Sequence, residues 1–102
     1  MTERYNGWTN YETWCANLWI DQDSTYWHEH TRDIASQQGY DREDSTYELS
    51  RVMESYYDEF APDTEGMYAD LLNASMSNIN WYEIAGHYVD DVEVDAPDEI
   101  EE

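Results

Sequence analysis

Two histidines, His28 and His30, are the residues best suited to bind a metal ion, with Glu29 and Asp33 beside them. Imidazole and carboxylate groups are ordinary ligands of zinc and manganese. Residues two apart on a helix point about 200° apart, so these two imidazoles cannot face one ion there. We therefore interpret His30, which falls on an apolar stripe, as a partly buried side chain satisfied by a neighbour, and we predict no metal site.

The single cysteine, Cys15, is the only candidate thiol nucleophile. It lies between Trp14 and Ala16 with no basic residue nearby to stabilise a thiolate, so we expect a small core residue. Nucleophilic catalysis also needs a base and an oxyanion site, and the four glycines show no such arrangement. Carboxylate pairs carry no information where 25 residues are acidic. We predict no enzyme, no catalytic residue and no cofactor.

The stretch from Tyr5 to Ile20 holds three of the five tryptophans and the clearest helix start. Thr9 and Glu12 have the spacing of a capping box, which predicts a helix from Asn10 to about Asp21. Its apolar residues follow the i, i+3, i+4, i+7, i+8 pattern, and we expect them to seed the core, with Trp14 as an anchor. They are Tyr11, Trp14, Cys15, Leu18 and Trp19.

Further helices are predicted by caps and apolar spacing along the rest of the chain. Asp23 and Ser24 can cap a second helix that ends at about Gln38, and it lies so close to the first that the two must form an antiparallel pair or an abrupt corner, with their tryptophans in contact. The third opens at a second capping box, Ser45 with Glu48, and ends before Pro62. Its stripe is Leu49, Val52, Met53, Tyr56, Tyr57 and Phe60.

Asp63 and Thr64 offer caps for a fourth helix, and Asn80 with Glu83 for a fifth that ends near Asp91. The inward stripe expected of the fourth is Met67, Tyr68, Leu71, Leu72, Ser75 and Met76, and that of the fifth is Trp81, Ile84, Ala85, Tyr88 and Val89. The fold class is all-α, a small irregular bundle of about five helices. We expect one helical domain at residues 1–91 and an acidic, disordered, flexible tail at 92–102, where like charges repel.

The charge balance is far from ordinary, with 25 acidic residues, four arginines, no lysine and a net charge of −21. Such self-repulsion opposes folding in dilute buffer, whereas at molar salt the screening length is about 3 Å. The sixteen aromatic residues argue against a disordered chain. One cysteine fits a reducing compartment, and no apolar run is long enough for a membrane helix. We predict a halophile's cytoplasmic protein without membrane contact.

The excess of acidic residues also limits the ways in which the protein can act on nucleic acids or their binding proteins. Four arginines cannot neutralise a phosphate track, so we predict no direct nucleic-acid binding. Carboxylates one helical turn apart have nearly the spacing of phosphates, and Glu54, Asp58 and Glu59 on the third helix are candidates for such an array. Residues 52–102 carry fifteen acidic residues and no base, against ten and four in residues 1–51. This pattern fits either a solvated halophilic surface or a DNA mimic.

Aromatic residues at the edges of the expected stripes or outside them are candidates for a contact surface. Tyrosine in half-buried positions of a chain that avoids long aliphatic side chains explains the same surplus, and both interpretations stay open. The candidates are Trp8, Tyr40, Tyr47, Tyr68 and Tyr82.

Two motifs, NGWTNYETW from Asn6 and NWYEIAGH at Asn80 to His87, resemble a family of small proteins of unknown function found in phages, plasmids and prokaryotic genomes. The resemblance implies a genomic context and no agreed activity. Our first hypothesis is a non-enzymatic, halophile-adapted protein-binding module of a haloarchaeon or similar prokaryote, or of its virus or plasmid. The alternative is an acidic DNA mimic that inhibits a host defence or DNA-binding protein. The sequence identifies neither the partner nor the oligomeric state.

Overall fold

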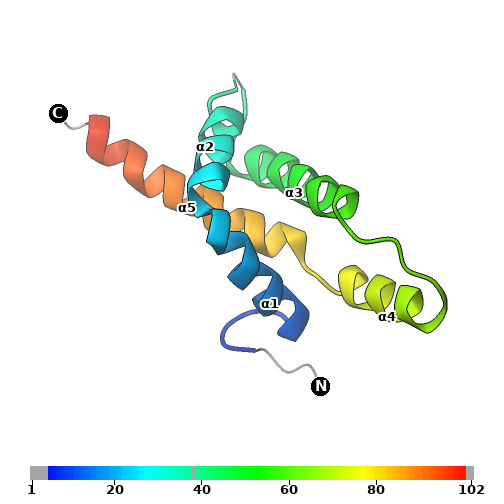
Figure 1. Cartoon of the computed structure of the whole chain (residues 1–102). Helices are drawn as coiled ribbons and strands as arrows, with labels where there is room; N and C mark the ends of the chain where they lie inside the picture. The colour runs from blue at the N-terminus through cyan, green and yellow to red at the C-terminus, as the bar shows by residue number, and fades with distance from the viewer. Residues whose placement is uncertain (1–4, 38, 101–102) are drawn as a thin grey trace.

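The chain folds into α-helices joined by short loops (Figure 1). The structure, a computed structural model, describes residues 5–37 and 39–100, and of residues 93–100 the backbone only. Its elements are α1 (Tyr11–Ile20), the 3-10 turn η1 (Asp21–Asp23), α2 (Ser24–Ala35), α3 (Arg42–Glu59), α4 (Gly66–Ser77) and α5 (Trp81–Ile100). No strand occurs in these residues, which confirms the all-α class. Because α1, η1 and α2 follow without a break, the five helices make four separate helical segments.

The core lies where α2, α3 and α5 pack on one another. Trp27 of α2 is fully buried at its centre, and its indole Nε1 donates to the hydroxyl of Tyr57 on α3 at 3.1 Å. The stripes predicted for the third and fifth helices supply most of the rest. The other buried apolar residues are Ile20, Ile34, Leu49, Met53, Trp81, Ile84, Ala85, Tyr88, Val89 and Val92.

The expected packing of the first two helices on each other is wrong. They run end to end through η1, so their tryptophans lie in separate clusters. The ring of Trp14 packs on Tyr5 and Tyr11, with centroids 5.0 and 5.6 Å away, whereas Trp27 packs on Tyr56 and on Tyr57. Trp14 is only partly buried and lies outside the core cluster, so the prediction of a core anchor there is also wrong.

The stripe predicted for the first helix faces mostly outward. Tyr11 and Leu18 are exposed, and Trp19 has 67% of its surface exposed. The buried side of α1 instead carries Thr13 and Ile20. A small hydroxyl side chain packs inward there because it makes hydrogen bonds across the helix contact, which a search for apolar spacing cannot detect.

Both predicted capping boxes are displaced. Asn10, one residue after Thr9, caps α1 and accepts a hydrogen bond from the amide of Thr13 at 2.8 Å. The third helix begins four residues before the predicted Ser45 cap, at a capping box formed by Asp41 and Asp44. A carboxylate is as good a cap as a hydroxyl and is favoured by the helix dipole, so the earlier acidic pair begins the helix.

Helix α4 stands apart from the bundle (Figure 1). It contains no buried residue, and the predicted caps Asp63 and Thr64 are replaced by Glu65. The radius of gyration, 15.2 Å, exceeds the roughly 13 Å of a compact chain of this length, in keeping with α4 and the end of α5 both extending from the bundle. The stripe predicted for this helix exists in sequence, but only Leu72 and Met76 are even partly buried.

Helix α5 starts beside its predicted cap, Asn80, and extends to Ile100, past the expected end at Asp91.

Arg42 at the start of α3 binds Asp90 through two hydrogen bonds of 2.6 and 3.0 Å, which hold the pKa of that carboxyl below its usual range. A Cβ at Gly86 would lie 3.2 Å from the Arg42 guanidinium, so glycine leaves room for this crossing. The predicted flexible tail, residues 92–102, lies almost wholly outside the described side chains.

No helix in the described part of the chain is both long and apolar enough to cross a membrane.

Candidate functional site: a motif contact and an apolar groove

The two sequence motifs meet in space, where the starts of α1 and α5 cap one another. The hydroxyl of Thr13 donates to the Asn10 side chain at 2.6 Å and accepts from the amide of Asn80 at 2.9 Å. The Asn80 side chain accepts from the amide of Glu83 at 3.0 Å, and the Glu83 carboxylate accepts from the amide of Thr9 at 3.1 Å. Each motif therefore satisfies backbone donors of the other, which is a structural role.

Trp8, a predicted interaction residue, takes part in the same contact. Its indole lies 4.5 Å from the imidazole of His87, centroid to centroid, and packs against the core. The turn before it is closed by paired backbone hydrogen bonds of 2.8 Å between Tyr5 and Trp8, with Asn6 and Gly7 at positive φ. Trp8 is half-buried, which fits a packing role.

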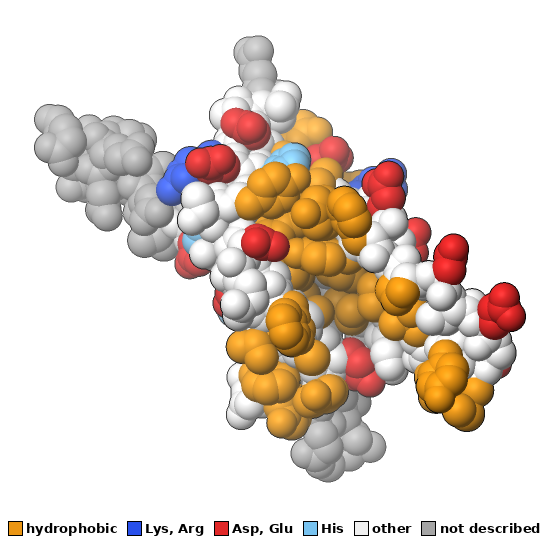
Figure 2. All heavy atoms as spheres, viewed as in Figure 1, with side chains coloured by type: hydrophobic (Ala, Val, Ile, Leu, Met, Phe, Trp, Pro, Cys, Tyr) orange, Lys and Arg blue, Asp and Glu red, His pale blue; other side chains and the backbone are white. Residues whose placement is uncertain are grey.

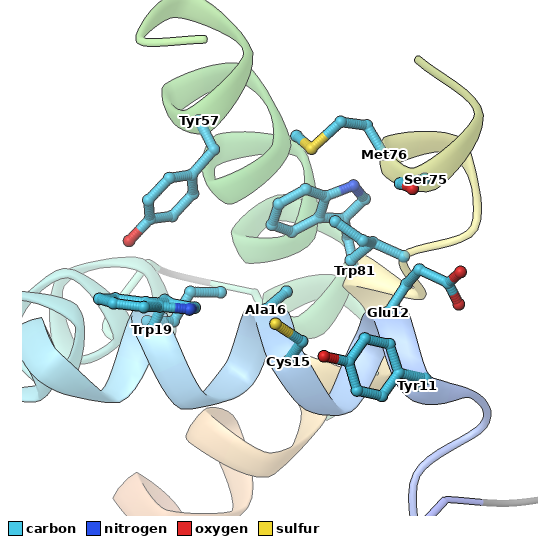
Figure 3. Close-up of a pocket in the computed structure, with 11 residues that line it drawn as sticks. Tyr11, Glu12, Cys15, Ala16, Trp19, Tyr57, Ser75, Met76 and Trp81 are labelled. Carbon is cyan, nitrogen blue, oxygen red and sulfur yellow. The ribbon is translucent and has the colours of Figure 1, made fainter. Parts of the chain in front are cut away.

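An apolar groove of about 370 Å³ opens beside the motif contact (Figure 3). Helix α1 forms its floor, Tyr57 points toward it from α3, and Met76 and Trp81 close the far side. It is exposed on the surface and almost entirely apolar. Its lining is Tyr11, Glu12, Cys15, Ala16, Trp19, Ile20, Tyr57, Ser75, Met76, Ile79 and Trp81.

Few polar groups enter the groove. Glu12 is its only carboxylate, and the thiol of Cys15, beside the Tyr11 hydroxyl, raises the pKa of that tyrosine. Burial raises the pKa of Tyr57, which keeps that hydroxyl neutral at ordinary pH. Such a lining suits the burial of apolar side chains from a partner better than the transfer of protons or groups.

Further exposed apolar side chains lie on both helices beside the groove. Figure 2 shows hydrophobic side chains gathered over α1, in the hollow between α1 and α4, and at the outer end of α4. We call this surface the α1–α4 face. Its exposed members are Tyr11, Leu18, Trp19, Met67, Tyr68 and Leu71.

The predicted interaction tyrosines are all exposed, but they lie on different elements. Tyr40 precedes α3, Tyr47 is on α3, Tyr68 is on α4 and Tyr82 is on α5. Tyr47 contacts the guanidinium of Arg51 of its own helix, 5.8 Å from the ring centroid. Only Tyr68 belongs to the α1–α4 face, so the four do not form one surface.

The predicted carboxylate candidates are exposed on α3. Glu54 and Asp58 border a shallow hollow of about 240 Å³ between α3 and α4, and Glu59 ends the helix. Their contribution to binding stays a prediction.

The histidines lie on opposite sides of α2, as their spacing requires. His28 Nε2 is 3.6 Å from a carboxylate oxygen of Asp91, and the His30 ring stacks on Trp27 with centroids 5.5 Å apart. The expected hydrogen bond of His30 is not found, since its buried Nδ1 has no partner. Among the described residues, no group of three or more metal-binding side chains comes together.

The groove was not predicted, although the sequence carries a signal for it. Small residues, Cys15 and Ala16, lie between Trp14 and Trp19 on α1 and leave a hollow beside large rings. These small residues indicate a groove only when it is known which side of α1 is exposed.

The whole chain, residues 1–102, matches the model of a family of unknown function, DUF7249, and belongs to that family. No curated protein and no solved structure matches it. Family membership carries no activity, and the two motifs and an origin in phages or plasmids stay predictions.

Proposed function

We propose that the protein is a non-enzymatic, acidic protein-binding module adapted to high salt, and that the groove between α1 and α4 is its binding surface. The observation that carries this proposal is an exposed, almost uncharged hollow of about 370 Å³ on a chain with a net charge of −21. Monomeric proteins rarely leave a large contiguous apolar surface in water, and such surfaces mark binding sites.

The partner segment that fits this groove is a helix with an apolar face and few charges. Several large side chains are needed to fill the hollow, and one carboxylate, Glu12, gives little to attract a strongly basic segment. At molar salt, charge pairs at the surface are screened within about 3 Å, whereas the burial of apolar surface retains its strength. An apolar groove therefore retains its affinity for a partner at molar salt, where a charged binding surface would lose it.

The environment itself is part of the proposal. The acidic excess and the absence of lysine support a halophilic host, a haloarchaeon or similar prokaryote or its virus or plasmid. The single cysteine supports a cytoplasmic location, where disulfides are rare.

The test is capture of host proteins at 2 M KCl by the intact chain and by two matched variants. Trp19→Glu places a charge in the groove, and Tyr47→Glu places the same charge on an exposed ring of α3 outside it. We expect Trp19→Glu to lose the captured protein and Tyr47→Glu to retain it. Alkylation of the only cysteine, Cys15, with a bulky maleimide should act like Trp19→Glu. Equal capture of a host protein by all forms would refute the groove as the surface that binds it.

The DNA-mimic alternative rests on a different surface and is tested separately. Glu54, Asp58 and Glu59 are changed to their amides, and competition with duplex DNA for a host restriction or replication enzyme is measured. A mimic should lose competition in this variant, because helix-borne charges hold a fixed spacing. An intact chain that never displaces DNA would rule mimicry out.

A further inference from the structure

The apolar stripe of α4 is only partly covered by its own chain. Its last turn borders the groove through Ser75 and Met76, whereas Met67, Tyr68 and Leu71 of the first two turns are exposed. An amphipathic helix of this kind buries its stripe against another element. Since α4 already meets the groove with its last turn, its first two turns extend away from that groove and cannot fill it.

The two helices that form this face carry few charges, although the chain has 25 acidic residues and Glu54, Asp58 and Glu65 lie at its border. Helices α1 and α4 together carry two carboxylates, Glu12 and Asp70, and no basic residue. Helical geometry places Asp70 about 150° from the centre of the α4 stripe, on the far side of that helix. A surface that meets another chain of charge −21 needs few acidic side chains at its centre, and the centre of this face has only Glu12.

The molecule thus has an apolar groove with no side chain of its own filling it and an apolar helix face that its own chain covers only in part. Both surfaces are apolar and nearly uncharged, so each suits contact with the other. We propose that the occupant of the groove is α4 of a second copy of this chain, with the first copy's α4 in the second copy's groove. This inference rests on the proposed function, of which it names the partner. The exchange is two-fold and closed, so each copy makes the same pair of contacts.

The exposed area is sufficient for such a pair. The α1–α4 face has six large side chains that are 47–69% exposed. At about 200 Å² for each, they offer on the order of 700 Å² per copy. A stable interface of standard size buries about 800 Å² per partner, so this face alone supplies most of the contact.

Sedimentation equilibrium of the full chain at 2 M KCl measures the association. We expect a mass of twice 12.2 kDa for the intact chain. Trp19→Glu in the groove and Leu71→Glu on α4 should each raise the dissociation constant by about 100-fold or more, because each buries an unpaired charge. Tyr47→Glu should leave it unchanged. Circular dichroism checks that every variant is folded, and a folded monomer with the intact sequence overturns the inference.

Disulfide trapping identifies which surfaces meet. Leu71→Cys adds one thiol to the native Cys15. Mild oxidation should then yield a covalent dimer in which the introduced thiol of one copy is bonded to Cys15 of the other, readable by mass spectrometry of peptides. Tyr47→Cys is the control and should not form a bond with Cys15. A bond within one chain, or no bond at all in a folded dimer, overturns the exchange of α4.

The two proposals fail in different ways. If the intact chain stays at 12.2 kDa but loses a captured host protein in Trp19→Glu, a second copy is not the occupant and the groove binds another protein. If neither self-association nor capture depends on Trp19, both proposals fail.

Discussion

Replacing Thr13 by valine should cost about 1–3 kcal/mol of unfolding free energy, although it keeps the shape of a fully buried side chain. The hydroxyl makes two hydrogen bonds, to Asn10 at 2.6 Å and from the amide of Asn80 at 2.9 Å. Losing the first costs about 1 kcal/mol, and leaving the Asn80 amide without a partner costs about 1–3 kcal/mol. The added methyl group returns about 0.8 kcal/mol.

Thr31→Val is the matched control, since Thr31 is also fully buried in a helix. Its hydroxyl donates at 2.6 Å to the carbonyl of Trp27, one turn earlier in α2. That carbonyl also belongs to the hydrogen-bond ladder of the helix, so its loss leaves no buried group unpaired, and we expect a change within about 0.5 kcal/mol.

Urea unfolding at 2 M KCl, followed by tryptophan fluorescence and circular dichroism, gives both values. The slope against urea should be equal in the two variants, because neither changes the surface exposed on unfolding. If Thr13→Val is as stable as Thr31→Val, the contact between the two motifs does not hold the fold together, and our account of the motifs is wrong.

Three further predictions concern stability. Trp27→Ala should cost about 3–5 kcal/mol, against less than about 1.5 kcal/mol for the partly exposed Trp14→Ala, and denaturant midpoints at molar salt compare them. Midpoints of the intact chain should rise steeply between 0.05 and 2 M KCl, since salt screens its charge of −21; equal midpoints would contradict halophilic adaptation. Burial and a 2.6 Å hydrogen bond to Asp21 raise the pKa of Tyr88 above its usual value near 10. The contribution of Tyr88 to the free energy of unfolding is therefore complete below pH ~10 and falls above it, because the phenol ionises in the unfolded chain first. Tyr88→Phe should lose less stability than the intact chain between pH 9 and 11, as measured by urea midpoints.

The parts of the fold that apolar spacing alone determines were predictable. Leu49, Met53, Ile84 and Val89 lie in the core as their stripes indicate, because α3 and α5 pack along their lengths. The stripe predicted for the first helix is wrong because Thr13, a polar residue, faces inward to meet Asn80, a residue 67 positions away. Hydrogen bonds over such distances leave no periodic signal in the sequence.

The sequence predicted some residues of the candidate site but not their arrangement in space. The sequence showed an apolar stripe on the fourth helix, and the structure shows that the chain covers only its end, near Met76. Whether a stripe meets its own chain or a different one depends on loop geometry, which composition does not encode. For the same reason the tyrosine candidates, chosen by their position beside stripes, lie on three different helices and one loop.

The contact between the starts of α1 and α5 joins residues that are 67 to 74 positions apart in the chain. During synthesis, the N-terminal segment leaves the ribosome well before its partner exists. At about 5–20 residues per second, the delay is roughly 3 to 15 seconds. For that time Trp8, Thr13 and Ile20 have no α5 to pack against, and the aromatic start of the chain is exposed to every other protein in the cell. The motif contact is thus a late step of folding, and its partners are needed together before the domain is complete.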